Sequence, residues 1–216
     1  MKPLTTYILN MPDRQERKAS VEREFGKARA LFDISFVRPV ENKLPRLSHW
    51  LTFRELAERA RREQLPCFIF CEDDHVFTPD YSETLLKETL CQTDALEADI
   101  LLGGVSWMDS PVQVRDHLFW LNRFNGTQFV IVFNRFYDRI LGSRYDERRV
   151  VTDFHISSVS DNIFVAYPFL SVQKEFGYSD VTPSNGKEGY VDGLFKATSD
   201  GLRILDKVRN FYDRLR

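Results

Sequence analysis

The chain has 216 residues, of which 43% are hydrophobic and 29% are charged, a composition typical of a soluble globular protein. Lys and Arg number 30 and Asp and Glu number 32, so the formal charge is −2 and the overall basicity of a nucleic-acid-binding protein is absent. At this length we expect a single domain with a substantial hydrophobic core.

The N-terminal sequence lacks an apolar signal segment, and no window approaches the ~20 apolar residues of a membrane span. We therefore expect a cytoplasmic location, with peripheral contact at the inner face of the membrane left open. The three cysteines, Cys67, Cys71 and Cys91, form no CxxC pair. We interpret them as reduced structural thiols rather than as metal ligands or a disulfide.

Strands and helices alternate in the first half of the chain. Short apolar runs predict strands at residues 4–9, 31–37, 67–71 and 99–102. A capping-box spacing of Asp13 and Glu16 predicts one helix, a second is expected from about Ser48, and Thr78 with Pro79 predicts the start of a third.

The second half carries looser patterns. Strands are predicted at residues 117–121, 128–133 and 164–172, with a turn at Asn125-Gly126. Residues 179–193 are predicted to be a loop, and a helix is expected from about Ser199 to the end of the chain. Together these elements indicate an α/β fold with a mostly parallel central sheet flanked by helices.

Three acidic residues, Glu72-Asp73-Asp74, directly follow the predicted strand at residues 67–71. In open α/β sheets, ligands bind at the carboxyl ends of the strands. Adjacent carboxylates repel one another unless a cation compensates them, and Mg²⁺ or Mn²⁺ is usually held by one or two carboxylates together with substrate phosphates. The cluster thus predicts a divalent-metal site. The alternative is a solvated acidic turn, and His75 is either its exposed neighbour or a partner of the metal ligands.

Other short segments follow the same order and spacing as those of a known family. They are Ile8-Leu9-Asn10-Met11 with Arg14 and Arg17, Leu47-Ser48-His49, residues 68–74, Gly126-Thr127, Thr152-Asp153-Phe154, residues 167–173 and Ser179-Asp180-Val181. As an ordered set, they resemble glycosyltransferase family 25, the lipopolysaccharide-type glycosyltransferases. Two positions depart from the family pattern: Phe53 stands near a common Trp, and Gln128 stands where His is frequent.

The resemblance implies a GT-A-like, Rossmann-like fold in one domain. Residues 1–104 would form the nucleotide-sugar-binding half, residues 105–198 the acceptor side, and residues 199–216 a C-terminal helix. The implied activity is a hexosyltransferase of lipopolysaccharide biosynthesis. It would move a sugar with inversion from a nucleotide-diphosphate donor, expected to be UDP-linked, to a glycan or lipid-linked saccharide acceptor.

The resemblance also implies roles for particular residues. Glu72 and Asp74, with His155, would hold Mn²⁺ or Mg²⁺, and Asp153 would be the general base that takes the acceptor proton. The donor would be contacted by four residues: Asn10, Arg17, Asp73 and Asp180. The residues themselves leave plainer alternatives open, namely a helix N-cap for Asp153, a structural His155, a solvated Arg17 and a simple turn at Ser179-Asp180.

Two other functions are compatible with the same acids. A metal-dependent phosphohydrolase or nucleotidyltransferase would need more carboxylates around the ion. A sugar-nucleotide-binding module that has lost activity is the second alternative. The predicted terminal helix carries five basic residues, Arg203, Lys207, Arg209, Arg214 and Arg216, against Asp206 and Asp213. This helix is interpreted either as a solvated face or as a contact with anionic lipid.

Overall fold

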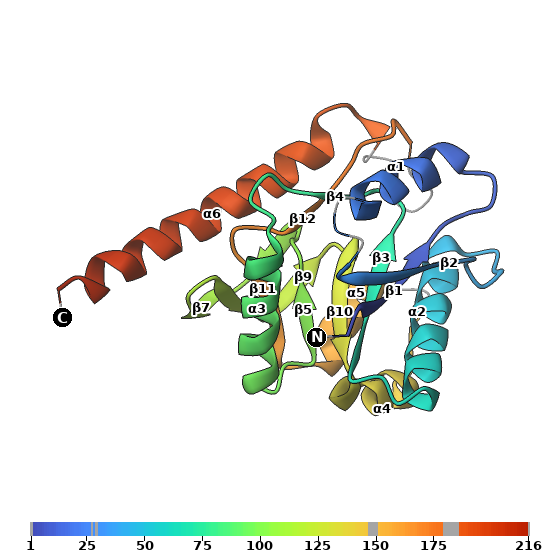
Figure 1. Cartoon of the computed structure of the whole chain (residues 1–216), viewed down its shortest axis with the longest axis horizontal. Helices are drawn as coiled ribbons and strands as arrows, with labels where there is room; N and C mark the ends of the chain where they lie inside the picture. Colours follow the sequence, from blue (N-terminus) through green and yellow to red (C-terminus); the bar gives the residue numbers. More distant parts are fainter. Residues whose placement is uncertain (1, 27, 29, 147–150, 179–185, 216) are drawn as a thin grey trace.

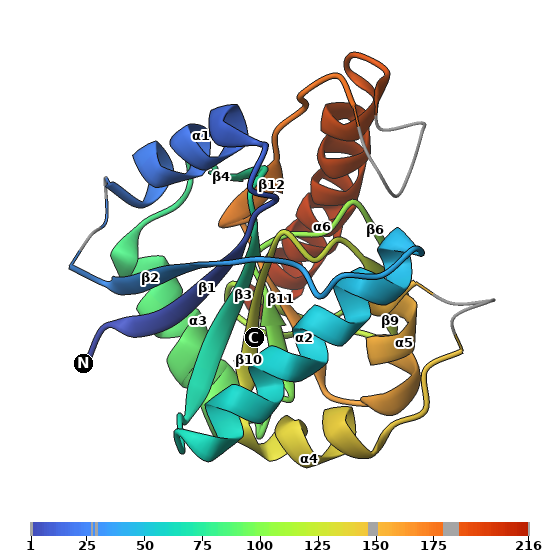
Figure 2. The ribbon, with the colours of Figure 1, turned by 90° about the vertical axis from the view of Figure 1, so that its right-hand side faces the viewer.

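The computed structural model describes residues 2–26, 28, 30–146, 151–178 and 186–215. An eight-stranded sheet runs through the centre of the molecule, and helices cover both of its faces (Figures 1 and 2). The helices are α1 (Gln15–Gly26), α2 (Pro45–Arg62), α3 (Glu83–Ala95), α4 (Asn134–Gly142), α5 (Thr152–Val159) and α6 (Tyr190–Asp213).

The strand order in the central sheet is β2-β1-β3-β10-β5-β11-β8-β7. These strands are β1 (Leu4–Leu9), β2 (Phe32–Val37), β3 (Cys67–Glu72), β5 (Ile100–Leu102), β7 (Val112–Arg115), β8 (Leu118–Leu121), β10 (Phe129–Phe133) and β11 (Ile163–Ala166). The pairings make β10 and β8 run against the other six strands. The predicted α/β class with a mostly parallel sheet is therefore confirmed.

The core lies in two layers, one on each face of the sheet, because alternate residues of a strand point to opposite faces. On β3, Phe68 and Phe70 pack with α2 and α4, where Trp50, Phe53 and Phe136 are buried. The intervening Ile69 and Cys71 belong to the opposite layer, with buried residues of α1 and α3. The strand is thus apolar on both faces, as its sequence predicts.

Two small ribbons lie beside the central sheet. β4 (His75–Phe77) pairs with β12 (Ser171–Gln173), and β6 (Trp107–Asp109) pairs with β9 (Arg123–Asn125), both antiparallel. None of these strands was predicted as a separate element. Because each spans three residues, its sequence carries almost no periodic signal.

Several predicted boundaries were wrong. The α3 helix starts after Ser82, whose hydroxyl caps the Leu85 N–H at 3.1 Å, and the Thr78 hydroxyl donates instead to the carbonyl of Phe169. The predicted strand at 164–172 is divided into β11 and β12, which belong to different sheets. The α2 helix begins with Pro45 in its first turn, a favourable position for proline.

The C-terminal helix is longer than its sequence predicts, because it begins at Tyr190 rather than near Ser199. It contacts β6, β7 and β12, and its C-terminal end extends beyond the sheet (Figure 1). None of the helices in the described ranges is long and apolar enough to cross a membrane. Cys67, Cys71 and Cys91 are free thiols, and Cys71 is buried.

Candidate active site

A cavity of about 330 Å³ opens at the carboxyl ends of β1 and β3. Its walls come from segments that are distant in sequence: the ends of β1 and β3, α1, the start of α2, the turn before β10, and the start of α5. Because β10 runs antiparallel to β3, its N-terminal turn reaches the same edge of the sheet at which β3 ends. The Glu72 N–H donates to the Gln128 carbonyl at 3.1 Å and joins these two segments.

At one end of the cavity, two acids share one arginine. The Arg17 guanidinium lies 3.2 Å from Asp73 Oδ1 and 3.4 Å from Asp74 Oδ2, and all three side chains are almost fully buried. Burial lowers the pKa of Arg17, but the charges of Asp74 and Asp73 outweigh this effect, so its net pKa is raised. Arg17 is therefore a permanent cation bound into the acidic cluster, and the alternative of a solvated surface arginine is wrong.

Neutral side chains hold the two acids in place. Asn10 Nδ2 donates to Asp73 Oδ2 at 2.8 Å, and Gln173 Nε2 donates to Asp74 Oδ2 at 2.8 Å. The other carboxylate oxygen of Asp74, Oδ1, is buried and has no hydrogen-bond partner among the residues that the structure describes. Burial, followed by the charges of Glu72 and Asp73, raises the pKa of Asp74 well above its usual value.

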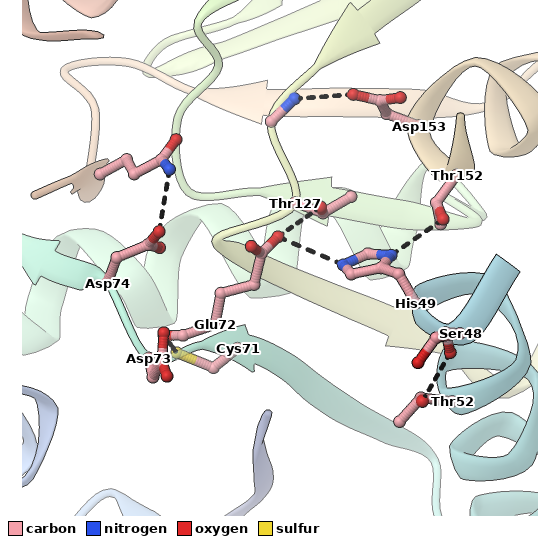
Figure 3. A network of polar contacts seen from close by, with 12 residues as sticks. Ser48, His49, Thr52, Cys71, Glu72, Asp73, Asp74, Thr127, Thr152 and Asp153 are labelled. Carbon is pink, nitrogen blue, oxygen red and sulfur yellow. Dashed lines mark hydrogen bonds and ion pairs between the residues drawn. The ribbon is translucent and has the colours of Figure 1, made fainter. Parts of the chain in front are cut away.

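The third acid of the cluster points a different way. Glu72 Oε1 accepts a hydrogen bond from the Thr127 hydroxyl at 2.5 Å and lies 3.4 Å from His49 Nε2 (Figure 3). The other ring nitrogen of His49 lies 2.8 Å from Thr152 Oγ1. Burial raises the pKa of Glu72, but the bonds from His49 and Thr127 outweigh that effect, so the net pKa is lowered. Glu72 is therefore held as a carboxylate.

Asp153 lies across the cavity, in the first turn of α5 (Figure 3). Its Oδ2 accepts bonds from Asn125 Nδ2 at 2.5 Å and from the Gly126 N–H at 3.2 Å, and its Oδ1 accepts from the Phe154 N–H at 2.9 Å. Burial raises the pKa of Asp153 to about 6. The N-cap of α5 is Val151, so Asp153 does not cap the helix.

The structure places some predicted residues outside the cavity wall. Asn10 is buried behind Asp73 and supports it rather than lining the cavity. His155 packs its ring against Trp50 and Tyr145, with centroids 4.5 and 5.1 Å away, and burial lowers its pKa. This placement agrees with the structural alternative for His155. Asp180 lies outside the described residues.

His75 is part of the core. Its Nδ1 lies 2.7 Å from Ser171 Oγ, and its ring packs among Phe25, Phe77 and Phe129. Burial lowers its pKa to about 3, so the imidazole is neutral. The buried position of His75 excludes the alternative of an exposed neighbour of the acids.

The two departures from the family pattern also lie in the interior. Phe53 is fully buried between α2 and β3, and Gln128 Nε2 donates to the Gly104 carbonyl at 2.9 Å. Neither side chain lines the cavity. Both positions therefore belong to the packing beneath the site and not to its surface.

The sequence left several site residues without a role. His49, Asn125, Thr127 and Gln173 each contact one of the four acids, and Tyr178 accepts a bond from Arg17 through its carbonyl at 2.9 Å. His49, Thr127 and Gln173 fall within the family-like segments, and this position is the one sequence feature that could have identified them as site residues. No pattern in the sequence indicates that Asn125 or Tyr178 reaches these partners.

The acids suit a cation that the substrate helps to hold. Across the described ranges, no group of three or more His, Cys, Asp or Glu side chains is arranged as a complete metal site. Mg²⁺ and Mn²⁺ need fewer protein ligands, since one or two carboxylates with substrate phosphates suffice. The unpaired Asp74 Oδ1 and the high negative charge around it fit such an ion.

No known protein-family profile and no curated protein sequence matches the chain. Among solved structures, apo UDP-glucose pyrophosphorylase aligns with a TM-score of 0.48 at 6% identity, covering 93% of this chain and 81% of that chain. A glycosyltransferase involved in the glycosylation of the major capsid of PBCV-1 aligns with a TM-score of 0.45 at 12% identity, covering 77% and 82%. At these values the similarity carries no argument about activity, and membership of glycosyltransferase family 25 stays a proposal.

Proposed function

We propose that the chain is a glycosyltransferase that moves a sugar, with inversion, from a nucleotide-diphosphate donor, expected to be UDP-linked, to a saccharide or lipid-linked saccharide. One observation carries the proposal. A single cavity holds a buried acidic cluster with an unpaired carboxylate oxygen at one end and a separate acid, Asp153, at the other. The first environment suits a metal-bound diphosphate, and the second suits proton transfer.

The cluster end is assigned to the donor. Asp74, with Glu72 in support, would hold the divalent cation, which when bound neutralises charge on the diphosphate leaving group. Arg14, Arg17 and Arg46 line the same cavity and supply positive charge around the phosphates. Asn10 and Gln173 fix the carboxylates, and Asp73 holds Arg17 in position.

The Asp153 end is assigned to the acceptor. The acceptor oxygen attacks the anomeric carbon while the bond from that carbon to the diphosphate breaks on the opposite face, and the acceptor proton passes to Asp153. The amide of Asn125 and the backbone N–H groups of Gly126 and Phe154 orient the carboxylate without adding charge. With a pKa of about 6, Asp153 is ionised at neutral pH and close to the value that suits a general base.

The test is turnover of a panel of UDP-sugars with Mn²⁺, Mg²⁺ or chelator, measured as UDP release with and without saccharide acceptors. We expect metal-dependent release that saccharides accelerate and that Asp74→Asn lowers about 10²- to 10³-fold. The exposed Asp138→Asn is the matched control, because Asp138 lies on the surface in an ion pair with Arg61. Hydrolysis of phosphoesters that carry no sugar, or donor binding without any turnover, would overturn the proposal.

A further inference from the structure

Two exposed aromatic side chains stand beside Asp153. Trp107 on β6 is 45% exposed and Phe154 on α5 is 41% exposed. Their ring centroids lie 5.8 Å apart at an interplanar angle of 84°. Two exposed aromatic rings in contact beside a cavity offer an apolar surface that a ligand can cover.

Strand register ties this pair to the cavity. Trp107 lies opposite Asn125 in the β6–β9 ribbon, and Asn125 is the residue that donates to Asp153. Directly opposed residues of an antiparallel pair share one face of the ribbon. Both side chains therefore face α5, where Asn125 contacts Asp153 and Trp107 contacts Phe154.

The same face of the ribbon carries polar side chains. Asp109 and Arg123 form the next pair in register on this face, while the intervening Phe124 points into the core. Asp109 Oδ2 also accepts a bond from Asn122 Nδ2 at 2.9 Å. An aromatic surface bordered by carboxylate, guanidinium and amide groups suits a ligand with one apolar face and many hydroxyl groups.

We infer that Trp107 and Phe154 form the subsite for the acceptor saccharide, with a sugar ring stacked on Trp107. The inference rests on the proposed function, because it assigns the donor to the opposite, arginine-bearing end of the cavity. A pyranose ring has apolar C–H faces that stack on indole and a rim of hydroxyls that Asp109, Asn125 and Arg123 can bind.

The first experiment measures binding alone. Of the three tryptophans, Trp50 is buried, and Trp107 is the most exposed, so quenching by iodide reports mainly on Trp107. We expect lactose, maltose or cellobiose to protect the fluorescence, and Trp107→Phe to remove the protected signal. Protection by UDP alone would place the nucleotide base here and overturn the inference, as would the absence of protection by every disaccharide.

The second experiment separates this subsite from the proposed reaction. Trp107→Ala and Phe154→Ala should raise the acceptor KM on the order of tenfold, a typical effect of truncating an aromatic contact. In Trp107→Ala, donor hydrolysis without acceptor should be unchanged. Tyr190→Ala, at a side chain of 42% exposure in the first turn of α6, is the matched control. Equal losses in hydrolysis and transfer would overturn the subsite, whereas no turnover in the unmodified protein would overturn the proposed function instead.

An independent observation concerns the C-terminal part of α6. Six large apolar side chains in this part of the helix and directly after it are 37–68% exposed: Ile204, Leu205, Val208, Phe211, Tyr212 and Leu215. The opposite side of this helix faces the protein, because Asp206 accepts a bond from Gln113 at 2.8 Å and Arg209 pairs with Asp116 at 3.2 Å. The helix thus turns a broad apolar face away from the body that it packs against.

Basic side chains lie along one side of the apolar face of α6. Arg203, Lys207 and Arg214 follow one another at spacings of four and seven residues and so lie on one side of the helix, beside the apolar face. In an antiparallel pairing of two such helices along Ile204, Val208, Phe211 and Leu215, these basic residues would face one another and repel. We propose that this face lies on an anionic lipid surface, with its basic side at the headgroups.

Vesicle binding tests this second proposal. The full chain should cosediment with phosphatidylcholine vesicles that contain phosphatidylglycerol, and less with vesicles of phosphatidylcholine alone or at high salt. Ile204→Ser with Phe211→Ser should abolish binding, and Lys207→Glu with Arg214→Glu should weaken it at least about tenfold. Arg23→Glu with Arg62→Glu, at exposed positions on α1 and α2, is the charge-matched control. A dimer in solution that Phe211→Ser dissociates, without vesicle binding, would overturn the proposal.

Discussion

The two ends of the cavity hold aspartates in opposite electrostatic settings. At the cluster end, Asp73 and Asp74 share the Arg17 guanidinium and repel each other and Glu72. At the other end, Asp153 contacts three neutral N–H donors, and burial is the main cause of its raised pKa. The first arrangement calls for more positive charge, and the second favours the gain and loss of one proton.

This difference explains how one cavity can serve two chemical tasks. Replacing an acid by its amide preserves the shape of the side chain. At the cluster the change removes a negative charge, and at Asp153 it removes the group that accepts the proton. The consequences should therefore differ in kind: donor binding fails in one case, and transfer fails in the other. A substitution at one end of the cavity should therefore leave the other end unchanged.

The largest effect is expected for Asp153→Asn. Loss of a general base typically lowers the rate by about 10²- to 10⁴-fold. We expect a fall of this size in kcat for transfer, with the affinity for UDP and Mn²⁺ unchanged. In the unmodified protein, kcat/KM should rise with pH up to about 6 and then level off, because Asp153 must be ionised to accept the proton. A flat profile from pH 4 to 8 would assign the proton to another group.

Asp74→Asn should act on the donor. Removal of one electrostatic contact to a developing charge costs about 10²- to 10³-fold in rate. We expect this loss together with a weaker apparent affinity for Mn²⁺, measured by titrating the metal during turnover. Asp138→Asn should match the unmodified protein. An Asp74→Asn variant with normal metal dependence would move the ion to other residues.

Arg17→Met should act on stability. Breaking a buried ion pair by removing one partner costs about 3–5 kcal/mol, because the remaining charge is left uncompensated. Burial raises the pKa of both Asp73 and Asp74, so their ionisation destabilises the fold as the pH rises. The loss, measured by denaturant unfolding, should therefore be larger at pH 8 than at pH 5. Arg61→Met, which breaks the exposed pair with Asp138, should cost less than about 1 kcal/mol.

The smallest effect concerns the pH dependence of stability at Asp153. The folded-state pKa of about 6 exceeds the ordinary value of 3.8, so the folded protein binds this proton more tightly than the unfolded chain. The stability that this proton contributes is present below pH 3.8 and is lost as the pH rises through about 6, a change of about 3 kcal/mol. Asp153→Asn should remove this step. An unchanged stability profile would show that Asp153 has an ordinary pKa.

The sequence predicts best where local pattern and tertiary structure agree. The strand at residues 67–71 is apolar on both faces, and the structure places it inside the sheet next to β1. Short strands such as β4 and β12 were missed because their pairing joins His75 to Gln173, far apart in the chain. The start of α6 was missed because its first turn contains Asp192 and Gly193, which were predicted to lie in a loop.

In the candidate site as well, the sequence shows features of adjacent residues and does not show contacts between distant ones. Glu72, Asp73 and Asp74 are adjacent in the chain, so their sequence shows the cluster directly. The Arg17–Asp73 ion pair and the Asn125–Asp153 bond connect residues on different elements, and only the folded chain brings them together. The chemical character of each acid depends on these distant partners, which local sequence does not show.

Calorimetric titration of UDP into the protein, with Mn²⁺ and then with chelator, tests whether the acidic cluster is the donor site. We expect the unmodified chain and Asp153→Asn to bind UDP equally well with Mn²⁺ and to lose most of the affinity in chelator. Asp74→Asn should bind weakly under both conditions. If Asp74→Asn binds UDP as tightly as the unmodified chain and with the same dependence on Mn²⁺, the acidic cluster is not the donor site.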